Sequence, residues 1–367
     1  MTGFEKTLSR ARLLALVMLL GLPLMAQDTK IAIIGLVHSH VWGHLKTVIS
    51  GGPAELVGIA ERNPELVAEA KRQGAERVTY FDDYLAMLDQ TKPQIVWAFV
   101  ENNRHLEIVK VCAPRKIHVI FEKPLASTYA DALEIRRLAR QHGIQVMTNY
   151  QMAWWPSNYA AKAKADSGAL GQVWRLRGIV GHGGPGSQGP RSQYFFAWLT
   201  DPEQNGGGSL MDFGCYNALW SLWYLGKPDK VYAHVNHLRP ETFPKVEDNA
   251  TLVLSYKNGV GLFEGSWDLP RGFQDLEVFG LTGSVYMTRN GVVYQPGRGE
   301  PQPLETPPLP PERAEPIAYM VHAVKSNQDL DGLVALDINV DVVEIIEAAR
   351  RSVKTGAAVP LPLPLPK

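Results

Sequence analysis

Between residues 30 and 150, short apolar segments alternate with segments of helical pattern, and this order constrains the fold more than any other feature. The apolar segments are continuous, which is typical of strands covered by helices on both faces. Strands joined by helices in this way form a doubly wound parallel sheet, whose ligands bind at the carboxyl ends of the strands. The expected strands lie at 30–35, 54–61, 78–81, 94–100, 117–124 and 144–149.

The second half of the chain has a different pattern. Apolar and polar residues alternate in segments separated by Gly and Asn, which predicts antiparallel strands. These segments are 171–181, 229–238, 249–259, 260–268, 275–288 and 292–296. Near the end, Val342, Ile345, Ile346, Ala349 and Val353 fall on one face of a predicted helix.

We therefore expect an α/β protein of two domains. Residues 27–150 form a Rossmann domain, and residues 151–358 form an α+β domain with a large, mostly antiparallel open sheet. The Pro- and Leu-rich residues 359–367 form an extended tail, because proline cannot continue a helix.

The N-terminus has the features of a secretory signal peptide. Three basic residues, Lys6, Arg10 and Arg12, precede an apolar run at 13–20, and Ala26 provides a small residue for cleavage. The alternative is a membrane anchor, but the run is shorter than the roughly 20 apolar residues that span a bilayer. The arginines are not adjacent, which favours the general secretory route over twin-arginine export. We expect residues 1–26 to be removed and the protein to be periplasmic, with no membrane association afterwards.

Composition excludes some classes of partner. Lys+Arg and Asp+Glu both total 37, so the chain has no excess charge to attract nucleic acid or an anionic membrane. Cys112 and Cys215 are the only cysteines, too few for a disulfide framework or a cysteine-rich metal motif.

The turn after the first strand is expected to be a modified phosphate-binding loop. Gly35 keeps the first position of a glycine-rich dinucleotide loop, whereas Val37, His38, Ser39 and His40 stand where further glycines are expected. Glycine lets the backbone approach a pyrophosphate placed at a helix N-terminus. The histidines could supply side-chain hydrogen bonds instead.

The residues after the second strand indicate which dinucleotide binds. Glu61 at the end of that strand suits a ribose 2′-hydroxyl, which favours NAD. The adjacent Arg62 could accept a 2′-phosphate or stack on adenine, so NADP stays possible.

Three motifs in order resemble the Gfo/Idh/MocA oxidoreductase family, named after glucose–fructose oxidoreductase and inositol dehydrogenase. They are "EKP" at 122–124, "SGALGQV" at 167–173 and "GGGSLMDFG" at 206–214. The resemblance runs from the first strand nearly to the end of the chain. It implies an enzyme that uses NAD or NADP to oxidise or reduce a hydroxyl of a sugar or polyol, and a homo-oligomer formed through the C-terminal sheet.

The resemblance also assigns cofactor-binding residues. Glu122 belongs to the "EKP" motif, and the "VENNRH" stretch at 100–105 keeps Asn102 and His105 of a family motif. Glu101 replaces a proline of that motif.

Three residues are expected to carry the chemistry. Removing hydride from an alcohol requires a group that takes the hydroxyl proton. Lys123 ends a buried strand, where we expect desolvation to lower its pKa toward neutrality. Asp212 and Tyr216, four residues apart, share a face if that segment is helical. Tyr216 stands where most of the family has histidine, and Leu219 replaces an expected acid.

Two alternatives stay open. His38, His40 and Glu101 all follow strand ends, and histidine with carboxylate is a common zinc or manganese ligand set. The protein could then be a redox-inactive, metal-assisted sugar lyase or hydrolase. The degraded glycine loop also leaves open a non-catalytic sugar-binding protein.

Overall fold

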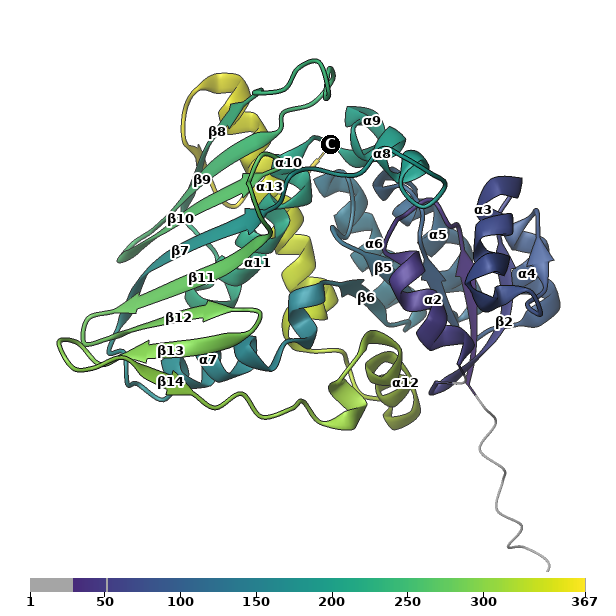
Figure 1. The fold of residues 1–367 in the computed structure, drawn as a ribbon, viewed down its shortest axis with the longest axis horizontal. Helices are drawn as coiled ribbons and strands as arrows, with labels where there is room; N and C mark the ends of the chain where they lie inside the picture. The colour runs from purple at the N-terminus through teal and green to yellow at the C-terminus, as the bar shows by residue number, and fades with distance from the viewer. Residues whose placement is uncertain (1–28, 51, 367) are drawn as a thin grey trace, which may run out of the picture.

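The computed structural model of the chain describes residues 29–50 and 52–366. The expected signal peptide at 1–26 lies outside the described residues. Figure 1 shows two sheets side by side, the first on the right and the second on the left, with helices between them and around the first sheet.

The N-terminal sheet is parallel, with strand order β3-β2-β1-β4-β5-β6. This is the doubly wound order that the alternating pattern predicts. Its strands are β1 (Thr29–Ile34), β2 (Ala54–Ala60), β3 (Tyr80–Phe81), β4 (Ile95–Ala98), β5 (His118–Glu122) and β6 (Val146–Asn149). The core strands β4 and β6 are buried at every position, which explains their uninterrupted apolar sequence.

Helices cover both faces of this sheet (Figure 1). They are α2 (Val41–Ile49), α3 (Pro64–Ala70), α4 (Tyr84–Thr91), α5 (His105–Cys112) and α6 (Tyr129–His142). Local sequence sets their ends. The Thr128 hydroxyl accepts from the Asp131 N–H at 3.1 Å to cap α6, and Gly143 ends it in the left-handed conformation.

The second sheet has nine strands in the order β14-β13-β12-β11-β7-β10-β9-β8-β15. Neighbouring strands are antiparallel except for β7 and β10, which run parallel. The strands are β7 (Val173–Gly181), β8 (Lys230–Asn236), β9 (Asn249–Tyr256), β10 (Gly259–Ser266), β11 (Phe273–Gly280), β12 (Ser284–Thr288), β13 (Gly291–Gln295), β14 (Gln302–Leu304) and β15 (Val359–Pro360). The predicted α/β fold with an open, mostly antiparallel second sheet is confirmed.

The C-terminal part of the chain also contains helices. They are α7 (Pro156–Asp166), α8 (Gln193–Leu199), α9 (Pro202–Asn205), α10 (Ser209–Asp212), α11 (Gly214–Leu225), α12 (Pro316–Ser326) and α13 (Leu336–Thr355). Helix α13 packs on α6 and on β8. Its first turn binds the N-terminal domain, since Asp337 accepts from Arg140 at 2.7 Å. Its last turns bind the second sheet, since Ser352 accepts from the Ala233 N–H at 3.0 Å.

The last helix contributes to the core, and the tail extends the second sheet. Of the face predicted on α13, Val342, Ile345, Ile346 and Ala349 are buried and Val353 is half-buried. The extended tail adds the short strand β15 beside β8. None of the helices within the described residues is both long and apolar enough to cross a membrane.

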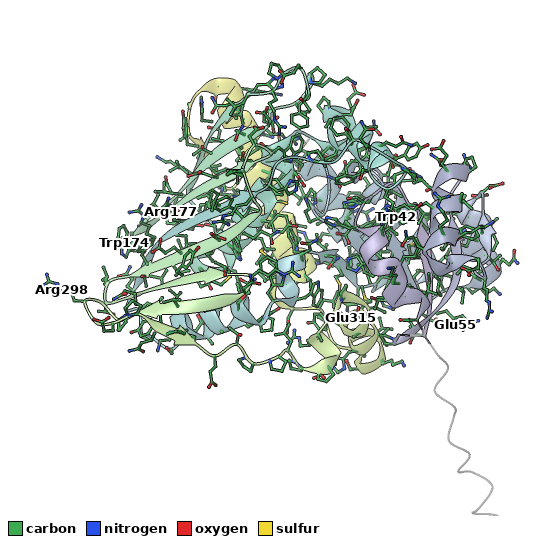
Figure 2. The ribbon with its side chains drawn as sticks, viewed as in Figure 1. Trp42, Glu55, Trp174, Arg177, Arg298 and Glu315 are labelled. Atoms are coloured by element: carbon green, nitrogen blue, oxygen red, sulfur yellow. The ribbon has the colours of Figure 1, made fainter. Side chains whose placement is uncertain are left out.

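One face of the nine-stranded sheet is left uncovered by α7, α11 and α13, which pack on the other face. A row of paired residues crosses six strands on the uncovered face: Tyr232, Val253, Leu262, Arg177, Glu277 and Tyr286. All six side chains are half-buried or exposed. Arg177 lies on the side of the sheet away from the N-terminal domain (Figure 2).

Candidate active site

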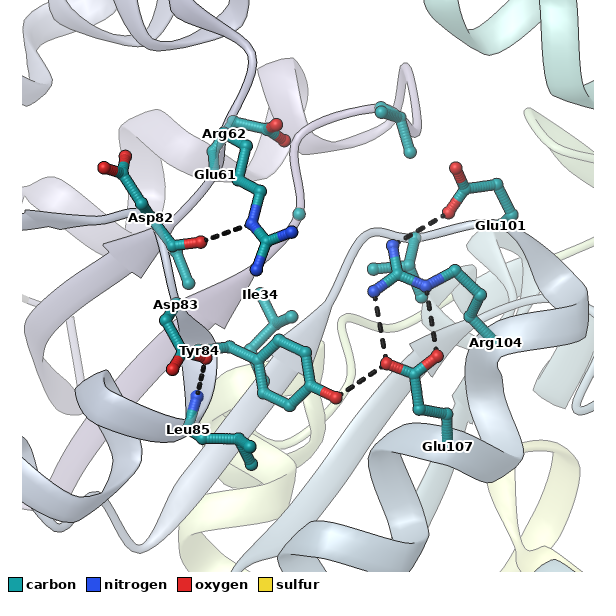
Figure 3. Close-up of a pocket in the computed structure, with 14 residues that line it drawn as sticks. Ile34, Glu61, Arg62, Asp82, Asp83, Tyr84, Leu85, Glu101, Arg104 and Glu107 are labelled. Carbon is teal, nitrogen blue, oxygen red and sulfur yellow. Dashed lines mark hydrogen bonds and ion pairs between the residues drawn. The ribbon is translucent and has the colours of Figure 1, made fainter.

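A cavity of about 520 Å³ opens at the carboxyl ends of β1, β2 and β4. Figure 3 shows its lining, in which Glu61 and Arg62 from the end of β2 lie opposite Glu101 and Arg104 from the loop after β4. Gly35 and Val37 of the modified loop also line it. The cavity therefore lies where the doubly wound topology predicts a ligand.

Gly35 occupies a position that excludes any side chain. Its φ is +79°, and an added Cβ would lie 2.6 Å from Val100 Cγ1 and 2.9 Å from the Phe99 carbonyl oxygen. The close approach of β1 to β4 thus requires glycine at the first loop position.

Glu61 organises the loop from the end of β2. Its carboxylate accepts from the Leu36 N–H and the Asn63 N–H, both at 2.8 Å. Arg62 donates from Nε to the Asp82 carbonyl oxygen at 2.7 Å, which holds its guanidinium over the cavity (Figure 3). Both residues lie where the ribose and adenine of a dinucleotide are expected.

The histidines of the loop turn away from this cavity toward β5. His38 is buried, and its Nδ1 accepts from the His40 N–H at 3.2 Å. Its ring lies against Phe195 and Trp198 of α8, with centroids 4.8 and 5.4 Å away. Burial, together with the neighbouring positive groups, lowers the pKa of His38 well below its usual value. Ser39 precedes His40 in the turn that leads into α2.

Glu122 meets the loop histidines at the end of β5. Its Oε2 lies 2.8 Å from His40 Nδ1, and its Oε1 accepts from Asn149 Nδ2 at 2.8 Å. Burial alone would raise the pKa of this carboxyl, but His40 and the other partners outweigh burial and lower it.

The carboxylate beside His38 and His40 is thus Glu122, not Glu101. Among the described residues, His38, His40 and Glu122 place one potential metal-ligating atom each within 4.8 Å of the others. Glu101 instead pairs with Arg104 at 3.3 Å, because the turn after Glu101 carries it to the cavity side of the loop. The alternative ligand set considered from the sequence had Glu101 in the place that Glu122 occupies in the structure.

Asn102 and His105 are buried beneath the site. Asn102 donates to the Asn205 side-chain oxygen at 2.7 Å. His105 Nδ1 lies 3.0 Å from the Leu125 carbonyl oxygen, and its ring stacks on Phe121 with centroids 4.2 Å apart. Neither residue lines the cavity, so their contact with cofactor stays a prediction.

Lys123 and Asp212 form a buried ion pair between the two halves of the chain. Lys123 Nζ contacts Asp212 Oδ1 and also donates to the Asp212 carbonyl oxygen at 3.0 Å. The other carboxylate oxygen accepts from Trp267 Nε1 at 2.8 Å. Each member of the pair is only 5% exposed. The partner of Lys123 is therefore Asp212, and Glu122 pairs elsewhere.

The expected direction of the Lys123 pKa shift is corrected by this contact. Burial does oppose the ammonium form, but the charge of Asp212 outweighs burial and raises the Lys123 pKa above its usual value. Burial likewise opposes the Asp212 carboxylate, and Lys123 lowers its pKa despite that. The pair is charged at neutral pH, so Lys123 is a proton donor in this state.

Tyr216 joins the pair from the first turn of α11. Its ring lies 5.2 Å from Lys123 Nζ and meets Tyr150 edge-on at 5.1 Å. The helix is interrupted at Phe213, so Asp212 lies in α10 and Tyr216 lies in α11. The two residues therefore share one helical face only approximately. The structure nevertheless brings Lys123, Asp212 and Tyr216 together.

Two other residues lie beside Lys123, Asp212 and Tyr216, and the sequence does not predict these contacts. Trp267 reads as one more aromatic, although its indole N–H fixes Asp212. His182 lies in a glycine-rich loop and packs edge-on against Phe213 at 5.2 Å. A lone histidine or tryptophan far from the motifs gives no spacing signal that would identify either one.

Two regions of the chain match known protein families. Residues 29–150 match an oxidoreductase family with an NAD-binding Rossmann fold, and residues 159–286 match the GFO/IDH/MocA C-terminal domain. The chain belongs to the Gfo/Idh/MocA family of oxidoreductases. The resemblance drawn from the sequence motifs is confirmed.

Named relatives within the Gfo/Idh/MocA family include sugar dehydrogenases. Levoglucosan dehydrogenase of Pseudarthrobacter phenanthrenivorans is 28% identical over 63% of this chain and 58% of its own length. D-xylose 1-dehydrogenase (NADP(+)) 2 of Haloferax volcanii is 28% identical over 59% of this chain and 63% of its own length. The chain thus spans less than two thirds of the length of these relatives.

Solved structures of the Gfo/Idh/MocA family share the fold over nearly the whole chain. The aldose-aldose oxidoreductase of Caulobacter crescentus, complexed with glycerol, has a TM-score of 0.77 at 22% identity, covering 91% of this chain and all of the other (100%). Levoglucosan dehydrogenase in complex with NADH and levoglucosan has a TM-score of 0.74 at 21% identity, covering 92% and 100%.

The described residues fit the adenosine half of NAD, the cofactor of this Rossmann domain. A backbone that only glycine can occupy at position 35 and a carboxylate at the end of β2 are the features such a site needs. When bound, NAD accepts or supplies a hydride.

Proposed function

We propose that the protein transfers a hydride between tightly bound NAD(H) and a hydroxyl or keto carbon of a sugar or polyol, with NADP(H) as an alternative cofactor. The observation that carries this proposal is the buried Lys123–Asp212 pair beside Tyr216, which lies at the end of β5, on the same carboxyl edge of the parallel sheet as the cavity. The sugar dehydrogenases among its relatives support the substrate class.

Lys123 acts as the acid in the direction of reduction. Asp212 holds it as an ammonium, whose N–H groups hydrogen-bond the carbonyl oxygen of the substrate. As the carbon is reduced, the Lys123 proton moves to that oxygen. In the direction of alcohol oxidation the same proton returns to Lys123.

Asp212 and Tyr216 position the groups between which this proton moves. Lys123 donates to one Asp212 oxygen and Trp267 donates to the other, so the carboxylate is fixed and in turn orients Lys123. Tyr216 lies against Lys123 and orients the reacting hydroxyl.

Gly35, Glu61 and Arg62 hold the adenosine half of the cofactor. To test binding, the purified mature protein is denatured and the released dinucleotide is quantified, and protein stripped of it is titrated with NAD and NADP. About one dinucleotide per chain supports the proposal, and failure to bind either one at millimolar concentration contradicts it.

We also propose that the mature protein is periplasmic and self-associates through the uncovered sheet face. The basic and apolar N-terminus supports export. The row of Tyr232, Val253, Leu262, Arg177, Glu277 and Tyr286 supports self-association, because it combines apolar area with both signs of charge.

A further inference from the structure

We infer that His38, His40 and Glu122 form a binding site for one divalent transition-metal ion such as Zn²⁺. The two imidazoles come from the loop after β1, and the carboxylate comes from the end of β5. One potential ligand atom from each lies within 4.8 Å of the others. Two histidines and one carboxylate are the protein ligands of many zinc sites.

Small side-chain movements would complete the geometry. Bonds from zinc to nitrogen or oxygen are about 2.0–2.2 Å, so tetrahedral ligand atoms lie about 3.4 Å apart. His40 Nδ1 and Glu122 Oε2 are at 2.8 Å, and insertion of an ion would move them slightly apart. All three ligand atoms lie within 4.8 Å of one another, so no pair would have to close by more than about 1.4 Å.

Glu122 is held in place from behind, as expected of a metal ligand. Asn149 donates to its Oε1 at 2.8 Å, and Trp154 donates in turn to the Asn149 side-chain oxygen at 2.8 Å. These two hydrogen bonds leave Glu122 Oε2 directed at His40. On the other side, the aromatic rings of Phe195 and Trp198 fix the ring of His38.

The burial of the Glu122 carboxyl group is a second, independent observation. The side chain is 1% exposed, and the adjacent Lys123 turns away to Asp212. Among the described residues, its ion-pair partners are His40 at 2.8 Å and His44 at 3.8 Å. A buried carboxylate needs a compensating charge, and a cation bound between Glu122 and the histidines supplies it.

Three protein ligands leave a fourth position for water or for an oxygen of a bound ligand. His40 keeps 24% of its side chain exposed, which gives an ion a route to the site. The loop at 36–40 is also where a pyrophosphate is expected, so the ion could bind phosphate or sugar oxygens there. The inference does not depend on hydride transfer and goes beyond it.

The test is metal binding by the untagged mature protein, measured without an activity assay. The protein is treated with chelator, dialysed and titrated with Zn²⁺ and, for its absorption spectrum, with Co²⁺. We expect one ion per chain and the intense visible bands of tetrahedral Co²⁺. His38→Ala and Glu122→Gln should abolish stoichiometric binding. Asn149→Ala should weaken it by about 10–100-fold, the usual effect of losing a group that orients a ligand.

Two matched variants serve as controls. Glu101→Gln removes the carboxylate on the cavity side of the loop, and His234→Ala removes an exposed histidine from β8. Both should bind like the parent, and circular dichroism should show that all variants are folded. Absence of stoichiometric binding in the parent, or unchanged binding by folded His38→Ala and Glu122→Gln, would overturn the inference. So would loss of binding in Glu101→Gln.

Discussion

Lys123 and Asp212 are 89 residues apart, yet they form a buried ion pair that joins the end of β5 to α10. The pair links the domain expected to hold the cofactor to the domain expected to hold the sugar. A charged pair this deeply buried is weak evidence for stability, because the desolvation cost can exceed the attraction. Its placement at the carboxyl edge of the parallel sheet, where the cavity also opens, favours a role in chemistry.

Gly35→Ala should disrupt the loop, because the new Cβ would meet Val100 and the Phe99 carbonyl at a positive φ. We expect a loss of more than about 1 kcal/mol in the free energy of unfolding, as for other strained backbone positions, and at least tenfold weaker dinucleotide binding. Urea denaturation and NAD titration measure the two effects.

The matched control for that variant is Gly43→Ala in α2, where an added Cβ meets nothing within 4 Å. It should leave binding unchanged and stabilise the helix by up to about 1 kcal/mol. Equal behaviour of the two alanine variants would show that the loop at Gly35 is not constrained as described.

His105 should make stability depend on pH. Its burial lowers its pKa from about 6.5 to about 4. Between these values the unfolded chain binds a proton that the folded chain does not, so stability falls as pH falls through this range. At 1.36 kcal/mol per pKa unit, the loss is about 3 kcal/mol.

Replacing His105 with glutamine should remove this contribution to the pH dependence, whatever its effect at neutral pH. Urea denaturation of both proteins at several values between pH 4 and pH 7 provides the comparison. Parallel curves for the parent and His105→Gln would contradict the assignment.

Self-association should depend on the uncovered sheet face. Leu262→Asp places a charge in the middle of the row that crosses the sheet, so it should shift an oligomer toward monomer in light scattering. Leu281→Asp changes an exposed leucine in the turn between β11 and β12 and should leave the mass unchanged. A parent that is monomeric, or an oligomer insensitive to Leu262→Asp, would refute this interface.

Export should follow from the N-terminus. A reporter fused after residues 1–26 should be cleaved near Ala26 and recovered in the periplasmic fraction. The same fusion with Lys6, Arg10 and Arg12 changed to glutamine should be exported less efficiently, because the basic start is part of the signal. An uncleaved, membrane-bound fusion would indicate an anchor instead.

The architecture could be predicted because each half of the chain has its own hydrophobic period. The continuous apolar strands indicate a parallel sheet, and the family resemblance assigns Lys123 and Asp212 to one site. Tertiary contacts could not be read in this way. The pattern of apolar and polar residues does not predict that the Glu122 side chain contacts His40, whereas the Glu101 side chain contacts Arg104.

The direction of the Lys123 pKa shift could not be predicted from the sequence for the same reason. A buried lysine without a partner has a lowered pKa, and the apolar strand that precedes Lys123 predicts its burial. The contact with Asp212 reverses the direction, and it depends on how α10 packs against the end of β5.

The most direct test of the account is hydride transfer in a single turnover. Protein loaded with NAD is mixed with a panel of sugars and polyols, and the absorbance of the reduced nicotinamide is followed. We predict transfer by the parent, a rate about 10²–10⁴-fold lower for Lys123→Ala with unchanged dinucleotide affinity, and a parental rate for Lys110→Ala, a surface lysine on α5. Absence of transfer to NAD or NADP with every substrate, or a parental rate for Lys123→Ala, would contradict it.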